Sequence, residues 1–367
     1  MSGSIFGKNF AISTWGESHG RALGVVVDGC PAGIPLDVED IQKDLDRRKP
    51  GRSPYATPRS EDDKVEILSG VFDGKTTGTP ISMIIFNKDQ RSRDYSNIRD
   101  TYRPGHGDYA YDQKYGFRDY RGGGRSSGRE TAARVAAGAI AKKILSMLDI
   151  EIMTYTLSIG HIKIESSNFD GQEIYKNPLA MPDKEAALKA AEFLDKLKEK
   201  GDSAGGIIEC VVKGLPSGVG EPVFEKLDAV LAQAIFSIGA VKGLEFGSGF
   251  EASKLTGSVN NDPMRVDDQG KVFKETNRAG GITAGISDGS PIVFRAAIKP
   301  TSSISTPQKS IDRTQNQNIE ILVKGRHDPI IVPRAIIVVE AMTAITLVDY
   351  LFQSILSRMD LIKRALQ

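Results

Sequence analysis

The alternation of apolar and polar positions along the chain predicts short strands mixed with amphipathic or fully apolar helices. Strand-like runs rich in β-branched residues occupy 10–15, 22–28, 65–69, 80–87, 206–213, 291–298 and 319–324. Helical spacing marks 131–145, 184–200, 222–236, a segment from the capping residue Asp37 to about Arg48, and a last run from about Pro333. The pattern therefore predicts a protein of the α+β class.

Residues 121–130, RGGGRSSGRE, are typical of a loop that binds an anion. Glycines 122–124 carry no Cβ atom, so the backbone can turn sharply and approach a ligand closely. The next helix begins here, and its free N–H groups and dipole favour negative charge. Arg121, Arg125 and Arg129 add guanidinium forks for a carboxylate or a phosphate. We expect an anionic ligand at this loop.

The helix that follows is rich in alanine and predicts close packing against another helix. Ala133, Ala137 and Ala141 are four residues apart, so they share one face. The most apolar segment, 336–352, carries Glu340 and Asp349, which favour a buried helix over a membrane span. Long apolar helices are therefore expected in the interior.

Internal sequence similarity predicts two related halves. The matching pairs, in the same order along the chain, are 25–45 with 210–231, 77–86 with 288–297, and the loops 106–129 and 327–334. We expect one domain spanning 1–367, built from pseudo-repeated halves at about 1–150 and 204–352. In such a β-α-β sandwich the long helices pack between two mainly antiparallel sheets.

Composition narrows the possible functions. Lys and Arg number 48 against 47 Asp and Glu, a net charge of +1, which argues against a general nucleic-acid binder. The only cysteines are Cys30 and Cys210, so a disulfide framework or a cysteine metal site is not expected. The first residues lack a basic segment followed by an apolar run, as a signal peptide would have. We expect a cytoplasmic protein without a membrane anchor.

Two short motifs imitate other enzyme classes, and a third motif is missing. A phosphate loop of the NTPase kind fails because Arg129 and Glu130 stand where Lys and Ser or Thr are needed. GESHG at 16–20 matches a serine-hydrolase elbow, but the predicted strand 22–28 follows it where a helix is required. No G-x-G-x-x-G motif follows a predicted strand, so a Rossmann domain of the nicotinamide-binding type is not expected. Two alternatives stay open: a serine hydrolase using Ser18, and a non-catalytic anion-binding scaffold on 121–130.

Histidines in glycine-containing loops are the candidate acid–base groups. His19, His106 and His327 lie in such loops, each with Arg or Glu close in sequence. Asp328 follows Arg326 and His327, an acid–base group beside a cation. No HxxxH or HxH spacing supports a metal site, so none is expected.

The chain resembles the chorismate synthase family over essentially its whole length. The resemblance rests on GESHG at 16–20, the long Arg- and Gly-rich block RPGHGDYAYDQKYGFRDYRGGGRSSGRETAARVAAGAIAKK at 103–143, KPTSS at 299–303 and GRHDP at 325–329. It implies a β-α-β sandwich, usually in a homotetramer, that binds reduced FMN without a Rossmann motif. It also implies conversion of 5-enolpyruvylshikimate 3-phosphate to chorismate by trans-1,4 elimination of phosphate, with no net redox change.

The resemblance also implies roles for individual residues. Substrate would be held by Ser18, Arg48, Arg103, Ser127, Arg129 and Arg326. FMN would be surrounded by Arg125, Ser126, Ser127, Gly239, Ala240, the backbone near Ala284, Lys299, Pro300, Thr301, Ser302, Ser303 and Arg326. His19 would protonate the departing phosphate, His106 the flavin near N1, and Asp328 would assist proton removal at N5.

Two positions depart from the family pattern. Ser53-Pro54-Tyr55 stands where relatives often have SRY, in a loop associated with nicotinamide dinucleotide binding. NADPH as the reductant of the flavin is therefore one possibility, and an external reductase is the other. Gly239 replaces an asparagine of the relatives, so a backbone contact would survive there and an amide side-chain contact would not.

Overall fold

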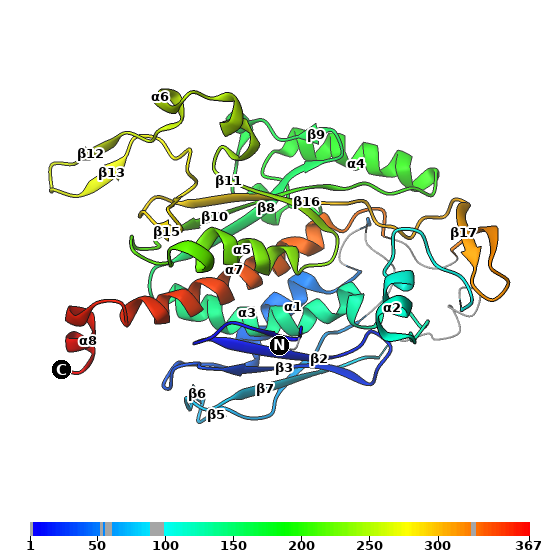
Figure 1. The fold of residues 1–367 in the computed structure, drawn as a ribbon, viewed down its shortest axis with the longest axis horizontal. Helices are drawn as coiled ribbons and strands as arrows, with labels where there is room; N and C mark the ends of the chain where they lie inside the picture. Colours follow the sequence, from blue (N-terminus) through cyan, green and yellow to red (C-terminus); the bar gives the residue numbers. More distant parts are fainter. Residues whose placement is uncertain (1–2, 52–53, 56–60, 89–98, 324–327) are drawn as a thin grey trace.

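Two five-stranded antiparallel sheets enclose a layer of helices (Figure 1). The structure is a computed structural model that describes residues 3–51, 54–55, 61–88, 99–323 and 328–367. The first sheet has the order β1 (Ile5–Phe6), β2 (Ala11–Gly16), β3 (Ala22–Asp28), β7 (Ile81–Phe86), β4 (Val65–Ile67). The second has the order β11 (Val241–Phe246), β16 (Ile292–Ile298), β10 (Gly206–Lys213), β8 (Glu151–Ile159), β9 (Ile162–Lys163).

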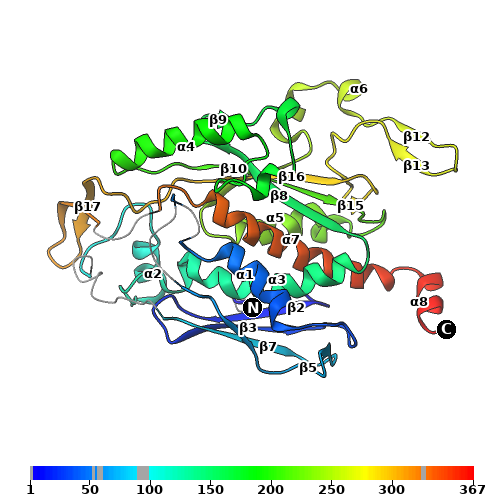
Figure 2. The same ribbon diagram turned by 180° about the vertical axis from the view of Figure 1, so that it is seen from behind.

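Four helices form the middle layer: α1 (Val38–Arg48), α3 (Thr131–Ser146), α5 (Leu227–Phe236) and α7 (Val332–Ile355). Helix α3 contacts the first sheet, α7 contacts β8 and β10 of the second, and α3 and α7 pack against each other. Helix α4 (Lys184–Glu199) lies on the outer side of the second sheet, as both views show (Figures 1 and 2). A single cluster of buried apolar side chains runs through all three layers.

Side-chain caps fix where two helices begin. Asp37 accepts a hydrogen bond from the backbone of Asp40, and the Asp40 side chain accepts one in return, which completes a capping box for α1. Asp183 accepts from the backbone N–H groups of Glu185 and Ala186 at the start of α4. Both caps lie where the sequence predicted them.

Small residues allow α3 and α7 to approach closely. The alanines 133, 137 and 141 are all buried. Gly138 lies against Ala341 of α7, and a Cβ atom added there would overlap the Ala341 backbone. Helix α7 is long and apolar enough to span a membrane, but 94% of its most apolar window is buried within the protein. The expectation of a buried apolar helix is confirmed.

Shorter elements extend from the two ends of the helical layer (Figure 1). At one end lie α6 (Gly257–Asn260), the hairpin β12 (Met264–Val266) and β13 (Val272–Lys274), and α8 (Met359–Ala365). At the other end lie α2 (Asp108–Tyr115) and the hairpin β17 (Gln308–Asp312) and β18 (Gln317–Ile321). The small pairs β5 (Val71–Phe72) with β6 (Lys75–Thr76), and β14 (Ile282–Thr283) with β15 (Ile286–Ser287), complete the strands.

The structure corrects the sequence prediction at several places. The strand expected at 319–324 is β18, which ends at Ile321. The helix expected over 222–236 is a 3₁₀ turn at 223–225 followed by α5 from Leu227. Strands β8 and β11 were not predicted; β11 contains Gly243 and two charged residues, which weaken its apolar pattern.

Candidate active site

Ser18 and His19 lie in the turn between β2 and β3, and both side chains are buried. Ser18 Oγ lies 3.2 Å from His19 Nδ1. The turn is held by Asn87, whose Nδ2 donates to two of its carbonyl groups at 2.8 and 3.0 Å. The Arg125 guanidinium donates to the carbonyl of Gly16 at the end of β2 (3.2 Å). Arg125 therefore supports the strand that leads to His19.

The glycine loop approaches the histidine turn closely. Gly122 has φ +79°, a left-handed conformation that glycine adopts without strain. A Cβ atom there would lie 2.7 Å from Nδ1 of His19, so a larger residue would displace the imidazole. The Gly122 carbonyl also accepts a hydrogen bond from Arg103 Nη2 (3.2 Å). The absence of a side chain at Gly122 thus brings His19 and Arg103 to one place.

Arg103 is fixed by the first residue of α2. Asp108 accepts from Arg103 Nε and Nη2, both at 2.8 Å, and from the Arg103 backbone N–H at 3.0 Å. Arg118 lies 3.2 Å from the same carboxylate. Burial opposes ionisation of Asp108, but hydrogen bonds from Arg103 outweigh it and lower the pKa of the carboxyl group. Arg103 is buried, and its direction is set by this pairing.

His106 joins two loops that are far apart in sequence. Its Nδ1 lies 3.0 Å from the carbonyl oxygen of Pro104, and its Nε2 lies 3.0 Å from Ser303 Oγ. Lys299 Nζ donates to the carbonyl of Gly105 at 2.7 Å. The segments 103–107 and 299–303 therefore lie side by side.

Burial and neighbouring cations favour the neutral forms of His106 and Lys299. Burial lowers the pKa of His106, and the positive charges of Arg103 and Lys299 lower it further. Burial also lowers the pKa of Lys299, and so does repulsion from Lys242. Among the described residues no carboxylate pairs with Lys299. An anion beside these groups would relieve the repulsion.

Arg48 and Arg129 share one buried carboxylate, that of Asp63. Asp63 Oδ2 accepts from Arg48 Nε (3.1 Å) and Nη2 (2.6 Å), and Oδ1 pairs with Arg129 Nη1. Arg129 Nε donates to Asn87 Oδ1 at 2.9 Å. Arg129 Nη2 is buried without a hydrogen-bond partner, although Glu61 lies 3.8 Å away. This nitrogen is the donor that remains for a ligand.

Asp328 adjoins the same cluster through Arg334, in the first turn of α7. Arg334 Nη1 lies 3.3 Å from the Asp328 carboxylate, and its Nε donates to the carbonyl of Arg48 at 3.4 Å. Thr301 Oγ1 donates to the Asp328 carbonyl at 2.6 Å. Asp328 is therefore linked to the KPTSS segment through its backbone carbonyl, and to the end of α1 through its carboxylate and Arg334.

Three of the hydroxyl groups predicted for the site make local contacts. Ser126 Oγ donates to the carbonyl of Gly123 at 2.7 Å. Ser127 caps the short turn before α3 by accepting from Arg129 N at 3.3 Å. Ser302 Oγ donates to the carbonyl of Gly105 at 2.9 Å. These contacts order the two loops around His106 and Arg129.

Residues 239–240 and Ala284 are not brought together. The carbonyl of Ala240 accepts from Lys299 N at 2.9 Å, so 239–240 adjoin the KPTSS segment. Ala284 lies in the β14–β15 turn, where Gly285 accepts from Leu227 N at the start of α5. Residue 240 follows the other end of α5, which is about 15 Å long. Within one chain Ala284 lies away from the other predicted residues.

Some predicted residues lie outside the described part of the chain. These are Arg326, predicted to contact both substrate and cofactor, its neighbour His327, and Ser53 of the divergent loop. Among the residues that are described, no group of three or more His, Cys, Asp or Glu side chains is placed to hold a metal ion.

Sequence reasoning missed three residues that hold the site together. Asp63 belongs to the charged run SEDD, which indicates only a solvated loop. Asp108 begins a short helix whose existence was not predicted. Arg334 follows Pro333 in an otherwise apolar helix start, and this isolated charge was the available signal.

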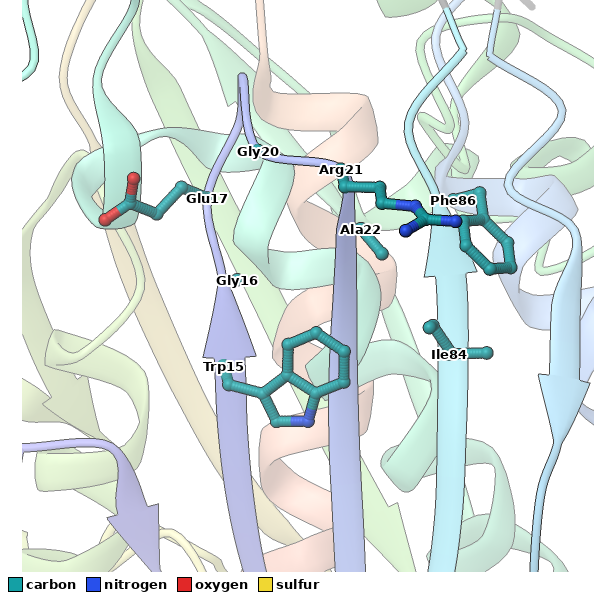
Figure 3. Close-up of a pocket in the computed structure, with 8 residues that line it drawn as sticks. All are labelled: Trp15, Gly16, Glu17, Gly20, Arg21, Ala22, Ile84 and Phe86. Carbon is teal, nitrogen blue, oxygen red and sulfur yellow. The ribbon is translucent and has the colours of Figure 1, made fainter.

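One cavity in the described part of the chain is lined by none of these buried arginines and histidines. It has a volume of about 470 Å³ and lies on the outer face of the first sheet (Figure 3). Trp15, Ile84 and Phe86 line it, and Arg21 extends toward Phe86 (Figure 3). Thr14 and Ile85, their neighbours in the strands, are buried on the opposite face. Glu17 and Gly20 of the histidine turn also line this cavity, but the buried Ser18 and His19 do not.

The arrangement combines buried guanidinium groups with two positioned imidazoles at one end of the helical layer. Such a site can bind a multiply charged anion and supply protons to it. A hydrolase elbow is absent at Ser18, because the turn joins β2 directly to β3 where a helix would be required. The geometry favours acid–base chemistry on an anionic substrate.

Comparison with known proteins gives a consistent result over the whole chain. The family model described as chorismate synthase matches residues 10–352. Curated proteins named chorismate synthase include those of Lachnospira eligens, 62% identical with 99% of each chain covered, and Agathobacter rectalis, 61% identical with 98% of each covered. A solved crystal structure of chorismate synthase is 33% identical, with a TM-score of 0.75, and covers 98% of this chain and 96% of its own.

The Arg-lined, histidine-bearing site and these similarities lead to the same assignment. The serine-hydrolase and scaffold alternatives are not supported by them. The chain belongs to the chorismate synthase family, whose members are lyases that remove phosphate.

Proposed function

We propose that this chain converts 5-enolpyruvylshikimate 3-phosphate to chorismate. In this trans-1,4 elimination one C–O bond to phosphate breaks, one proton is lost from the ring, and a second ring double bond forms. The observation that carries the proposal is the clustering of Arg48, Arg103 and Arg129 with His19 and His106 at one end of the helical layer. A substrate with two carboxylates and a phosphate needs such a cluster.

Substrate would be held by Ser18, Arg48, Arg103, Ser127, Arg129 and Arg326. Arg129 Nη2 supports this role most directly, because it is buried and makes no hydrogen bond, with only the longer 3.8 Å contact to Glu61, and such a donor favours binding of an acceptor. Arg48 and Arg103 already donate to Asp63 and Asp108. Their part would be to supply positive charge and to anchor the loops beside Arg129.

We infer that reduced FMN is the cofactor, and the residues near Lys299 fit it. Lys299 and Lys242 repel each other without a carboxylate between them among the described residues, which suits an anionic group. When bound, reduced FMN supplies electron density that helps the C–O bond to break, with no net redox change. It would be held by Arg125, Ser126, Ser127, Gly239, Ala240, Lys299, Pro300, Thr301, Ser302, Ser303 and Arg326, and by the backbone near Ala284.

Proton transfer would be divided between three residues. His19 would protonate the departing phosphate, and His106 would hold a proton near N1 of the flavin. Asp328 would assist proton removal at N5. A bound anion raises the pKa of an adjacent imidazole, which would offset the lowering of the His106 pKa by burial and by the neighbouring cations.

We further infer a homotetramer that works in the cytoplasm. Exposed apolar side chains on the projecting elements support self-association; they include Met264, Val266, Val272 and Phe273 of β12–β13 and Met359 of α8. The position of Ala284, away from the other cofactor residues of its own chain, is also consistent with a site completed in an assembly. Light scattering should give a mass near four times 39.7 kDa.

We infer an internal repeat behind the β-α-β sandwich. The order β2-β3-β7-β4 in one sheet parallels β8-β10-β16-β11 in the other. Helix α1 then corresponds to α5, and α3 to α7. On this pairing the second half would begin at Glu151, the start of β8, earlier than the boundary at 204 expected from sequence. The segment 160–205, with α4, would be an insertion.

Anaerobic assays with photoreduced FMN test the proposed activity. Phosphate and chorismate should form in equal amounts while the flavin stays reduced. Stoichiometric oxidation of the flavin would contradict the proposal, and fluorophosphonate labelling of Ser18 would favour a hydrolase. Replacing photoreduction by NADPH plus FMN decides whether this chain reduces its own flavin, given Pro54 in the divergent loop.

A further inference from the structure

Asp63 occupies an unusual position between two guanidinium groups. Its side chain is fully buried, and its carboxylate meets Arg48 through one oxygen and Arg129 through the other. Burial opposes ionisation, but the two arginines outweigh it and hold the pKa of Asp63 below its usual value. Asp63 therefore pairs with both buried cations, while the buried carboxylate of Glu61 lies farther away, 3.8 Å from Arg129 Nη2.

The backbone around Asp63 is held in place from α1. Asp63 has φ +48°, a left-handed conformation that Asp and Asn tolerate better than most residues. Its carbonyl accepts from Gln42 Nε2 (3.3 Å), and Gln42 Oε1 accepts from Val65 N (3.2 Å). The segment between α1 and β4 is therefore fixed at the residue that carries the carboxylate.

This carboxylate determines which nitrogens of the two arginines remain available. With Nε and Nη2 directed at Asp63, Arg48 turns Nη1 to the carbonyl of Gly128 and to Thr131 Oγ1, both at 3.3 Å, at the start of α3. Arg129 donates a hydrogen bond from Nη1 to Asp63 and another from Nε to Asn87. Its Nη2 is the one donor nitrogen left without a hydrogen bond.

We propose that Asp63 is a positioning residue for the substrate, which orients the guanidinium groups of Arg48 and Arg129 so that Arg129 Nη2 faces the substrate's anionic group. The inference rests on the proposed function and extends it to a residue that contacts no substrate itself. Without the carboxylate, two adjacent cations would repel each other and lose their common direction.

Three substitutions of Asp63 test its negative charge, the position of its carboxylate and its left-handed backbone separately. Asp63→Asn keeps the shape and tolerates the left-handed backbone, but removes the charge. Asp63→Glu keeps the charge and moves it by one methylene. Asp63→Gly keeps the turn and removes the side chain. Asp62→Asn is the matched control, because Asp62 is the exposed neighbour and, within the described part of the chain, pairs with Lys88 alone.

Steady-state kinetics should separate substrate binding from chemistry. We expect Asp63→Asn and Asp63→Gly to raise KM by about 10-fold to 100-fold, with a smaller change in kcat and unchanged FMN affinity. Asp63→Glu should give an intermediate KM, and Asp62→Asn the parent value. A purely structural role would lower the thermal midpoint and leave KM unchanged. A KM within about twofold of the parent in any folded Asp63 variant would overturn the proposal.

Chemical labelling tests the same point without turnover. Phenylglyoxal should modify Arg48 and Arg129 faster in Asp63→Asn than in Asp62→Asn, as measured by mass spectrometry of the peptides. Equal labelling rates would contradict a positioning role. If the parent protein releases no phosphate from 5-enolpyruvylshikimate 3-phosphate, the proposed function fails, and the labelling still decides whether Asp63 positions the two arginines.

Discussion

Ser303 Oγ lies 3.0 Å from Nε2 of His106, although 197 residues separate them in the chain. The other ring nitrogen faces the Pro104 carbonyl, which can only accept, so Nδ1 carries the hydrogen. In the neutral ring Nε2 then accepts from the Ser303 hydroxyl. The Pro104 contact fixes the tautomer of His106, and the Ser303 contact links the loop before α2 to the KPTSS segment.

Alanine substitution of His19 or His106 should reduce turnover by about 10²–10⁴-fold, the usual contribution of a positioned acid–base group. Both variants should fold and still bind FMN and substrate. His161→Ala is the control, because His161 is exposed and only packs edge-on against Phe193. Equal damage from His161→Ala, or near-full turnover by His19→Ala, would show that the acid–base roles are wrong.

Arg129→Ala should weaken binding of the substrate by about 2–5 kcal/mol, because one partner of a buried charge pair is removed. Arg129→Lys keeps the charge but cannot contact Asn87, Asp63 and an anion together, so an intermediate loss is expected. Isothermal titration calorimetry with substrate and no reduced flavin measures both. Arg134→Ala is the control, since Arg134 pairs with Glu130 on the preceding turn. Unchanged affinity in Arg129→Ala would refute the assignment.

Most of the fold could be predicted because each element carries its own periodic pattern and caps. The strand Ala22–Asp28 and the starts of α1 and α4 follow from local residue choice alone. Strand β11 could not be predicted from its sequence, because its glycine and charged residues are tolerated only where it pairs with β16 in the assembled sheet.

The motifs of the site could be predicted from the sequence, but the residues that hold them in place could not. The GESHG turn and the 299–303 segment could be identified from sequence, and the structure places them beside Gly122 and His106. The role of Asp63 depends on a left-handed backbone and on two arginines from other elements, which no local pattern reveals. Long-range pairing of charges is decided by the tertiary fold.

Gly138→Ala should destabilise the protein by roughly 1–3 kcal/mol, the cost of overpacking a close contact. The new methyl group would overlap Ala341 in the adjacent helix, so α3 and α7 would have to separate. Urea denaturation measures the free energy of unfolding. Gly257→Ala is the control, because a Cβ there meets open space. A neutral effect at Gly138 would mean that the two helices are packed less closely than described.

The buried carboxylate of Glu340 should make stability depend on pH in the acid range. Arg47 donates to it at 2.7 and 2.8 Å, and Lys142 at 2.9 Å. Burial opposes its ionisation, but these cations, with Arg47 first, lower its pKa from 4.5 to about 2. The unfolded chain then binds the proton more readily. Stabilisation by Glu340 is therefore complete above about pH 4.5 and is lost as the pH falls toward 2.

Glu340→Gln removes this charge and keeps the shape of the side chain. At pH 7 the variant should lose roughly 3 kcal/mol of the free energy of unfolding, since Arg47 and Lys142 lose their most buried shared anion and retain Asp44. The difference from the parent should shrink as the pH falls from 4.5, which urea denaturation at pH 7, 5, 4 and 3 would follow. Glu192→Gln, on the exposed face of α4, should match the parent at every pH. A constant difference between Glu340→Gln and the parent across this range would show that the loss comes from packing rather than from the charge.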